Sequence, residues 1–124
     1  MADTDEALRE LEASLGRLAA PAEEQLAYLN SLGTGELADE LALELHDDLL
    51  AVKGCAEPDL RDSAAMRAVV EVDDALQRMS GAANERLWRP EGLRAAEEWA
   101  ALRLLAAAAL ARLRAGGRPD SRRP

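Results

Sequence analysis

Several residue types are scarce in this chain of 124 residues, which has no phenylalanine, one tyrosine, two tryptophans and one cysteine. Isoleucine is also absent and valine occurs four times, so the residues that favour strands are nearly missing. A single cysteine excludes an intramolecular disulfide and is typical of a protein in a reducing compartment. These absences argue against a β-sheet and against a disulfide-rich domain.

Long hydrophobic runs are missing as well. The longest apolar stretch, LLAAAALA at 104–111, is far shorter than the roughly 20 residues that a helix needs to cross a bilayer. The first residues, MADTDEALRE, are acidic and lack the basic start and the apolar stretch of a signal peptide. We therefore expect a soluble cytoplasmic protein that does not contact a membrane.

The hydrophobic content of 48% consists almost entirely of leucine and alanine, which are strong helix formers. The length fits one domain with one core. The sequence therefore predicts an all-α fold, a compact bundle of four to five helices that occupies residues 1–115. Residues 116–124, with the sequence GGRPDSRRP, are expected to form a disordered basic tail.

Proline and glycine mark the ends of the expected helices, because proline fits the first turn of a helix and glycine often ends one. VVEV at 69–72 is the one patch that favours a strand, and we assign it to a helix because helix formers flank it on both sides. The predicted helices span 5–19, 21–32, 35–53, 58–80 and 90–115.

The first predicted helix carries four leucines on one narrow face. The spacing of Leu8, Leu11, Leu15 and Leu18 is 3-4-3, as in a coiled-coil seam. This seam has two interpretations: the helix docks on its own domain, or the seam joins two copies of the chain. Two heptads are too few to establish a coiled coil, so both interpretations stay open.

The last predicted helix is apolar nearly all round, since Arg103 is the only charged residue between Trp99 and Ala111. This composition predicts a central helix surrounded by the others. The segment RMSGAANERLW at 78–88 is interpreted as a joint in which Leu87 and Trp88 fold back onto the last helix. Trp88 and Trp99 either fill the core or anchor a partner.

The chain lacks recognisable motifs for catalysis or cofactor binding. Paired cysteines, a P-loop, a GxSxG elbow and the Glu-x-x-His pattern of di-iron bundles are all absent. His46 is interpreted as a surface or packed residue, and Cys55 as a small filler near a helix end. We therefore expect no enzyme, no metal and no other cofactor.

The net charge of −9 is unevenly distributed. Residues 1–80 contain 19 acidic and 6 basic residues, whereas residues 81–124 contain 5 acidic and 9 basic ones. A strongly acidic body repels nucleic acid and anionic lipid, and it favours a basic protein partner. The candidate partner-binding residues are Glu36, Asp39, Glu40, Glu44, Asp47 and Asp48 of the third predicted helix, with Asp73 and Asp74 as extensions.

Four segments relate the sequence to a group of proteins. AYLNSLGT, DELALELHDD, VDDALQRMSGAANERLW and EWAALRLLA occur in this order. In these segments the chain resembles an uncharacterised family of small, all-helical bacterial proteins. The resemblance covers roughly residues 21–113. It implies a defined helical fold, and it implies no activity and no catalytic residues.

These observations favour a protein that binds another protein. A small, acidic, helical protein without catalytic groups can cover a basic active site, and its charge would speed the encounter. The most concrete expectation is a neutraliser of the immunity or antitoxin kind. The alternative is a structural or adaptor homodimer that associates through the Leu8–Leu18 seam or through the last helix.

Overall fold

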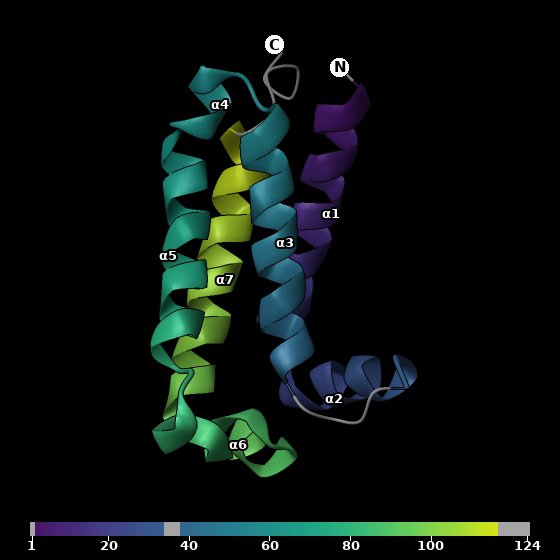
Figure 1. The fold of residues 1–124 in the computed structure, drawn as a ribbon, viewed down its shortest axis with the longest axis vertical. Helices are drawn as coiled ribbons and strands as arrows, with labels where there is room; N and C mark the ends of the chain where they lie inside the picture. Colours follow the sequence, from purple (N-terminus) through teal and green to yellow (C-terminus); the bar gives the residue numbers. More distant parts are fainter. Residues whose placement is uncertain (1, 34–37, 117–124) are drawn as a thin grey trace.

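A computed structural model of the protein describes residues 2–33 and 38–116. Within these residues, the body of the molecule consists of four long helices (Figure 1), namely α1 (Ala2–Ala19), α3 (Asp39–Cys55), α5 (Ala64–Arg78) and α7 (Glu97–Gly116). Each long helix packs beside the next and α7 returns to α1, so the four helices surround one core. The described residues contain no strand, and the predicted all-α bundle is confirmed.

Shorter helices connect the long ones at the two ends of the bundle (Figure 1). At one end lie α2 (Ala22–Ser31) and α6 (Pro90–Ala95), and α4 (Pro58–Arg61) lies at the other. A 3-10 helix, η1 (Ala82–Trp88), stands between α5 and α6. Successive long helices therefore run in opposite directions, as in other up-and-down bundles.

The leucine seam of α1 belongs to the core of the single chain. Leu8, Leu11, Leu15 and Leu18 are each at most 2% exposed. Their helix packs against α3 and α7. The interpretation that this helix docks on its own domain is confirmed, and a homodimer could use the seam only if the bundle opened.

The predicted helix over 58–80 is wrong as one continuous element, because the chain breaks between α4 and α5. Ser63 has an extended backbone, and its hydroxyl accepts a hydrogen bond from the amide of Met66 at 3.2 Å. Serine is among the best N-cap residues because its oxygen satisfies a free amide of the first helical turn. The patch VVEV lies inside α5, as predicted.

The predicted helix over 90–115 is likewise divided, into α6 and α7. Ala96 between them is extended, with ψ 138°. The turn brings α6 against η1 so closely that a Cβ at Gly92 would clash with the carbonyl oxygen of Arg86. Only glycine permits this approach of two backbones. This packing of α6 on η1 is a contact between elements, which helix propensity does not contain.

Helix α7 differs from the predicted central helix, because its outer face is exposed. Leu104 is 75% exposed, whereas Trp99 and Ala106 on the inner face are fully buried. Arg103 spans the end of the bundle, where its guanidinium donates to the side-chain oxygen of Gln25 at 3.0 and 3.1 Å and to the carbonyl of Leu93. The one charge between Trp99 and Ala111 therefore ties α2 and α6 to α7, and burial lowers the pKa of Arg103.

Three further predictions concern Cys55, the C-terminal tail and membrane-spanning helices. Cys55 is exposed at the end of α3, so its interpretation as a filler is wrong. Helix α7 continues through Gly116, and the remainder of the predicted basic tail, 117–124, lies outside the described residues. Among the residues that the structure describes, no helix combines the length and the hydropathy needed to span a membrane.

Candidate functional site

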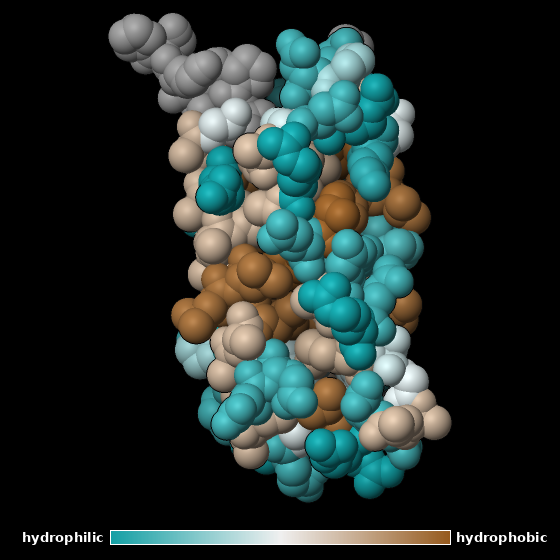
Figure 2. Space-filling view, turned by 90° about the vertical axis from the view of Figure 1, so that its left-hand side faces the viewer, coloured by the Kyte–Doolittle hydropathy of each residue, from teal (hydrophilic) through white to brown (hydrophobic). Residues whose placement is uncertain are grey.

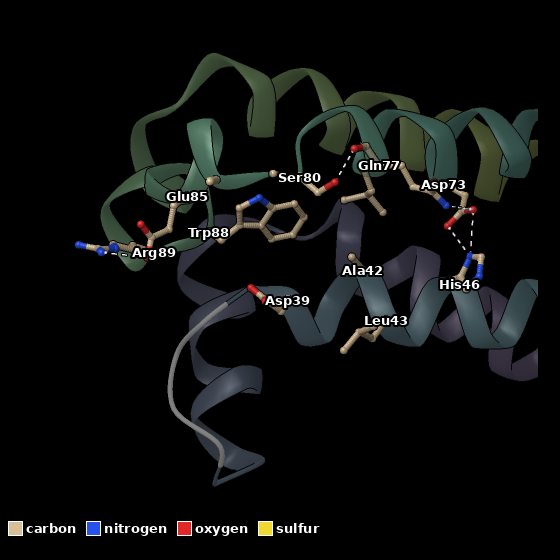
Figure 3. A pocket seen from close by; sticks show the side chains of 13 residues that line it. Asp39, Ala42, Leu43, His46, Asp73, Gln77, Ser80, Glu85, Trp88 and Arg89 are labelled. Carbon is tan, nitrogen blue, oxygen red and sulfur yellow. Dashed lines mark hydrogen bonds and ion pairs between the residues drawn. The ribbon is translucent and has the colours of Figure 1, made fainter.

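A groove with a volume of about 780 Å³ lies between α3 and α5 (Figure 3). We call it the α3–α5 groove. Helix α4 joins these two helices at one end of the bundle, and η1 lies at the other. The groove is lined by Asp39, Ala42, Leu43 and His46 of α3, Asp73, Leu76 and Gln77 of α5, and Ser80, Gly81, Ala82, Glu85, Trp88 and Arg89 around η1.

Trp88 forms the wall of the groove near the start of α3 (Figure 3). Its indole Nε1–H donates to the carbonyl of Met79 at 2.9 Å, and its ring meets that of Trp99 edge-to-face, with centroids 5.2 Å apart. Its carbonyl accepts the amide hydrogen of Ala38 at 3.0 Å. Trp99 is fully buried and donates to the carbonyl of Leu87 at 2.7 Å. The expected folding of Leu87 and Trp88 onto the last helix is therefore present, and it holds the Trp88 ring in place.

Gly81 allows the chain to turn from α5 into η1. Its φ is +105°, a conformation that residues with a Cβ rarely adopt. This position agrees with the predicted end of the fourth helix. Within η1, the side-chain amide of Asn84 donates to the carbonyl of Ser80 at 3.2 Å.

His46 and Asp73 face one another at the end of the groove that lies away from Trp88 (Figure 3). The Nδ1 atom of His46 lies 3.1 and 3.3 Å from the two carboxylate oxygens of Asp73, and the Gln77 amide also donates to that carboxylate at 3.3 Å. The Asp73 side chain is 10% exposed and that of His46 is 44% exposed. In the neutral imidazole, Nδ1 therefore carries the hydrogen and Nε2 is left as an acceptor.

The groove offers this imidazole no activated nucleophile among its lining residues. Ser80 supplies the one hydroxyl, and that hydroxyl donates to the carbonyl of Gln77 at 2.6 Å. Cys55, at the far end of α3, is not part of the lining. Across the described residues, no three side chains among His, Cys, Asp and Glu are grouped as metal ligands would be. The arrangement is suited to hydrogen bonding and to binding a positive charge.

Two of the predicted partner-binding carboxylates lie on the opposite flank of α3, where partners within the chain hold them. Glu44 accepts from Arg17 Nε at 3.1 Å and from the Tyr28 hydroxyl at 2.6 Å. Asp48 accepts from the hydroxyl of Ser14, a residue that is 2% exposed. We call these five residues the α1–α3 polar cluster. Its two carboxylates stabilise the contact between α3 and its neighbours in the chain.

The surroundings of Tyr28 in this cluster change the pKa of its phenol. The guanidinium of Arg17 lies over the Tyr28 ring, 4.6 Å from its centroid. Burial of the phenol raises the pKa of Tyr28 most, and its hydrogen bond to Glu44 raises it further. The cluster is therefore a set of mutually satisfied groups that favours the neutral phenol.

The other predicted site residues are distributed over several environments. Asp39 is exposed and lines the groove, and Glu40 is half-buried. Asp47 and Asp74 are exposed outside the groove lining, and Asp73 is buried within it. Glu36 lies outside the described residues. The acidic surface predicted along one side of α3 is thus divided between two flanks.

The sequence interpretation did not include two exposed leucines of α3. Leu43 is 55% exposed and Leu50 is 53% exposed. They are seven residues apart and lie off the buried stripe of Leu41, Leu45 and Leu49. The helical period alone could have found them, because they share a face that the core stripe does not use. Glu85 and Arg89 form an exposed ion pair at 3.3 Å and also line the groove. Their place in the groove depends on η1, and the helical period of the sequence could not have found it.

Comparison of the chain with models of protein families, with curated proteins and with solved structures gives no match. The function is therefore inferred from the geometry of the molecule.

Proposed function

We propose that the protein binds a basic protein partner through the α3–α5 groove and neutralises it, as an immunity protein or an antitoxin does. The observation that carries the proposal is an apolar groove whose ionisable lining is mainly acidic. Asp39, Asp73 and Glu85 line it, against Arg89 as the one arginine. The arginine is already paired with Glu85, so the uncompensated charge of the groove is negative.

The apolar part of the groove supports a protein ligand with aliphatic side chains. Leu43 belongs to α3 and Leu76 to α5, and Trp88 closes one end of the groove. A rigid, partly exposed tryptophan is typical of the residues that contribute most to binding energy. A lysine or arginine could place its aliphatic stem on Leu43 and Trp88 and its charged group near Asp39.

The surface beside the groove extends the same chemistry along α3. Asp39, Leu43, Asp47 and Leu50 are all exposed. Their spacing of four, four and three residues places them on one face of the helix. Acidic and apolar residues alternate along this face, which supports an amphipathic helix with basic and apolar side chains as the partner segment.

Because the surface is negatively charged, association with a basic partner should depend on ionic strength. Exposed charges that lie about 10 Å apart are largely screened at 0.1 M salt. Association with a basic partner should therefore be fast at low salt and slower at high salt. Burial of Leu43 and Trp88 is less sensitive to salt and should slow dissociation.

The test is retention of protein from native lysate at two salt concentrations, followed by mass spectrometry. The groove variant carries Asp39→Lys with Glu85→Lys. The matched control carries Glu6→Lys with Glu10→Lys, two exposed acids of α1 that change the net charge equally. We expect the unmodified chain and the control to retain one basic protein in stoichiometric amount, and the groove variant to lose it.

Circular dichroism should show the same helicity for all three proteins, because every changed residue is exposed. Equal retention by the groove variant would contradict the proposal, since the groove would then not be the contact. Loss in both variants would show that net charge acts without a defined surface. Retention of no stoichiometric protein by the unmodified chain would also contradict it.

A further inference from the structure

The outer face of α7 is apolar and exposed along most of its length. Figure 2 views the side of α5 and α7, and hydrophobic atoms gather along its left-hand part, where α7 lies. Leu104 is the most exposed large hydrophobic residue of this face, at 75%. The exposed residues of the face are Ala100, Ala101, Leu104, Ala107, Ala108 and Ala111. We infer that a second copy of this chain docks on this face and forms a homodimer.

A hollow opens at the edge of this face, beside Ala101. It lies between α5 and α7 and has a volume of about 430 Å³. Ala75, Ala101, Leu102 and Leu105 form its apolar wall. A two-fold dimer uses the same patch on both subunits, so that patch must both protrude and receive. Leu104 is the protruding group, and Ala101, which borders the hollow, precedes it by three residues on the same exposed face.

The spacing along α7 fits a helix-to-helix contact. Ala101, Leu104, Ala108 and Ala111 follow 3-4-3 spacing, which keeps a seam facing a partner helix. Three of the four are alanines, so the backbones of two helices can approach closely. The seam of α1 has the same spacing but is buried in the chain; the α7 seam is exposed and lacks a covering helix among the described residues.

The charges at the two ends of α7 select an antiparallel arrangement. Glu97 and Glu98 stand in its first turn and Arg114 in its last, with Arg112 also exposed. Glu97 precedes Leu104 by seven residues and Arg112 follows it by eight. A two-fold axis near Leu104 therefore brings the acidic end of one α7 to the basic end of the other. A parallel pair would bring like charges together.

This inference is independent of the proposed partner-binding function. The dimer surface lies over α5 and α7, whereas the α3–α5 groove opens between α3 and α5. Neither Leu104 nor the hollow shares a lining residue with that groove. Dimerisation should therefore leave the groove accessible.

The test is the mass of the purified full chain, measured by sedimentation equilibrium at high micromolar concentration. We expect twice the mass of one chain. Leu104→Glu should reduce the mass to that of one chain, because two carboxylates would be buried at the axis. The matched control is Leu43→Glu, which places the same change at the exposed leucine of α3 and should keep the dimer.

The antiparallel register has its own measurement. Arg112→Glu should weaken the dimer at low salt, and the addition of Glu97→Arg in the same chain should restore it. A monomeric unmodified chain, or a dimer that persists unchanged in Leu104→Glu, would overturn the inference. A dimer lost equally in Leu43→Glu would place the interface on α3 and would overturn it as well. Failure of the charge exchange to restore the dimer would overturn the antiparallel arrangement.

Discussion

Helix α3 has two polar flanks that look alike in the sequence and differ in the structure. On one flank, Glu44 and Asp48 are held by Arg17, Tyr28 and Ser14 in the α1–α3 polar cluster. On the other, Asp39 and His46 face the α3–α5 groove. Carboxylates that are five residues apart on one helix thus serve different purposes. An acidic helix face is therefore a candidate binding surface only where its charges are left without partners in the chain.

The two flanks of α3 also differ in how closely the neighbouring helix packs, with a closed flank against α1 and an open flank towards α5. Helix α1 fits closely against α3 through its buried leucine seam, whereas α5 stands off enough to leave a groove. The closed flank contributes to stability because it buries apolar area. The open flank leaves Leu43 and Trp88 partly exposed, and these would gain burial only from a partner. Stability and binding are therefore expected to respond to mutations on different sides of the same helix.

The largest expected effect compares two leucines of α3 that differ in burial. Leu45 is fully buried and Leu43 is 55% exposed. Leu45→Ala should lower the free energy of unfolding by about 2–5 kcal/mol, because it leaves a cavity in the core. Leu43→Ala should change it by less than about 0.5 kcal/mol. Urea denaturation followed by circular dichroism measures both, and comparable losses would contradict the assignment of the two faces.

The next effect compares the two kinds of carboxylate. Glu44→Ala removes the acceptor of Arg17 and Tyr28 and should lower the free energy of unfolding by about 1–2 kcal/mol. The control is Asp47→Ala, an exposed acid three residues away, which should change it by at most about 0.5 kcal/mol. If the same denaturation experiment gave equal values, the cluster would not distinguish the closed flank from the open one.

The smallest effect is the titration of Tyr28, the single tyrosine of the chain. Burial and the hydrogen bond to Glu44 raise the pKa of its phenol above the ordinary value of about 10. Because the pKa is higher in the folded chain, this group lowers the free energy of unfolding as the pH rises from about 10 towards the folded pKa. The ultraviolet absorbance of tyrosinate should therefore show a midpoint above that of free tyrosine.

Glu44→Gln should move this midpoint down without returning it to the free value, since burial remains the larger cause. The exposed Asp47→Asn serves as the control and should leave the midpoint unchanged. A midpoint equal to that of free tyrosine in the unmodified protein would show that the cluster is open to water.

The sequence predicts the architecture because its signals are local. Leucine spacing gives the helices, and Pro58 and Pro90 stand in the first turns of α4 and α6, as expected. The break at Ser63 had a local signal, an N-cap serine. The break at Ala96 had none, and α6, the helix before it, packs through Gly92 on the backbone of η1. Local patterns therefore give the helices, whereas a contact between elements, such as that of α6 with η1, is not contained in them.

The candidate site could be predicted only in part for the same reason. Asp39 and Trp88 were named from charge and residue type, and both line the groove. Whether Glu44 is free depends on Arg17 and Tyr28, which come from other helices. The burial of Asp73 against His46 likewise arises from the pairing of α5 with α3. Composition gives the number of charged residues, and tertiary contacts decide which of them remain free to bind a partner.

The most direct test of the open groove is a nuclear magnetic resonance titration of the 15N-labelled protein. The probe is a synthetic amphipathic helical peptide of leucine and lysine, and the control peptide contains leucine and glutamate. We predict saturable shifts at the Trp88 indole and at the amides of Leu43, His46 and Ser80, with Ser14 and Tyr28 unchanged. The acidic peptide should cause none. Shifts at the α1–α3 polar cluster, or no saturable shift with the basic peptide, would contradict the assignment of the groove as the binding surface.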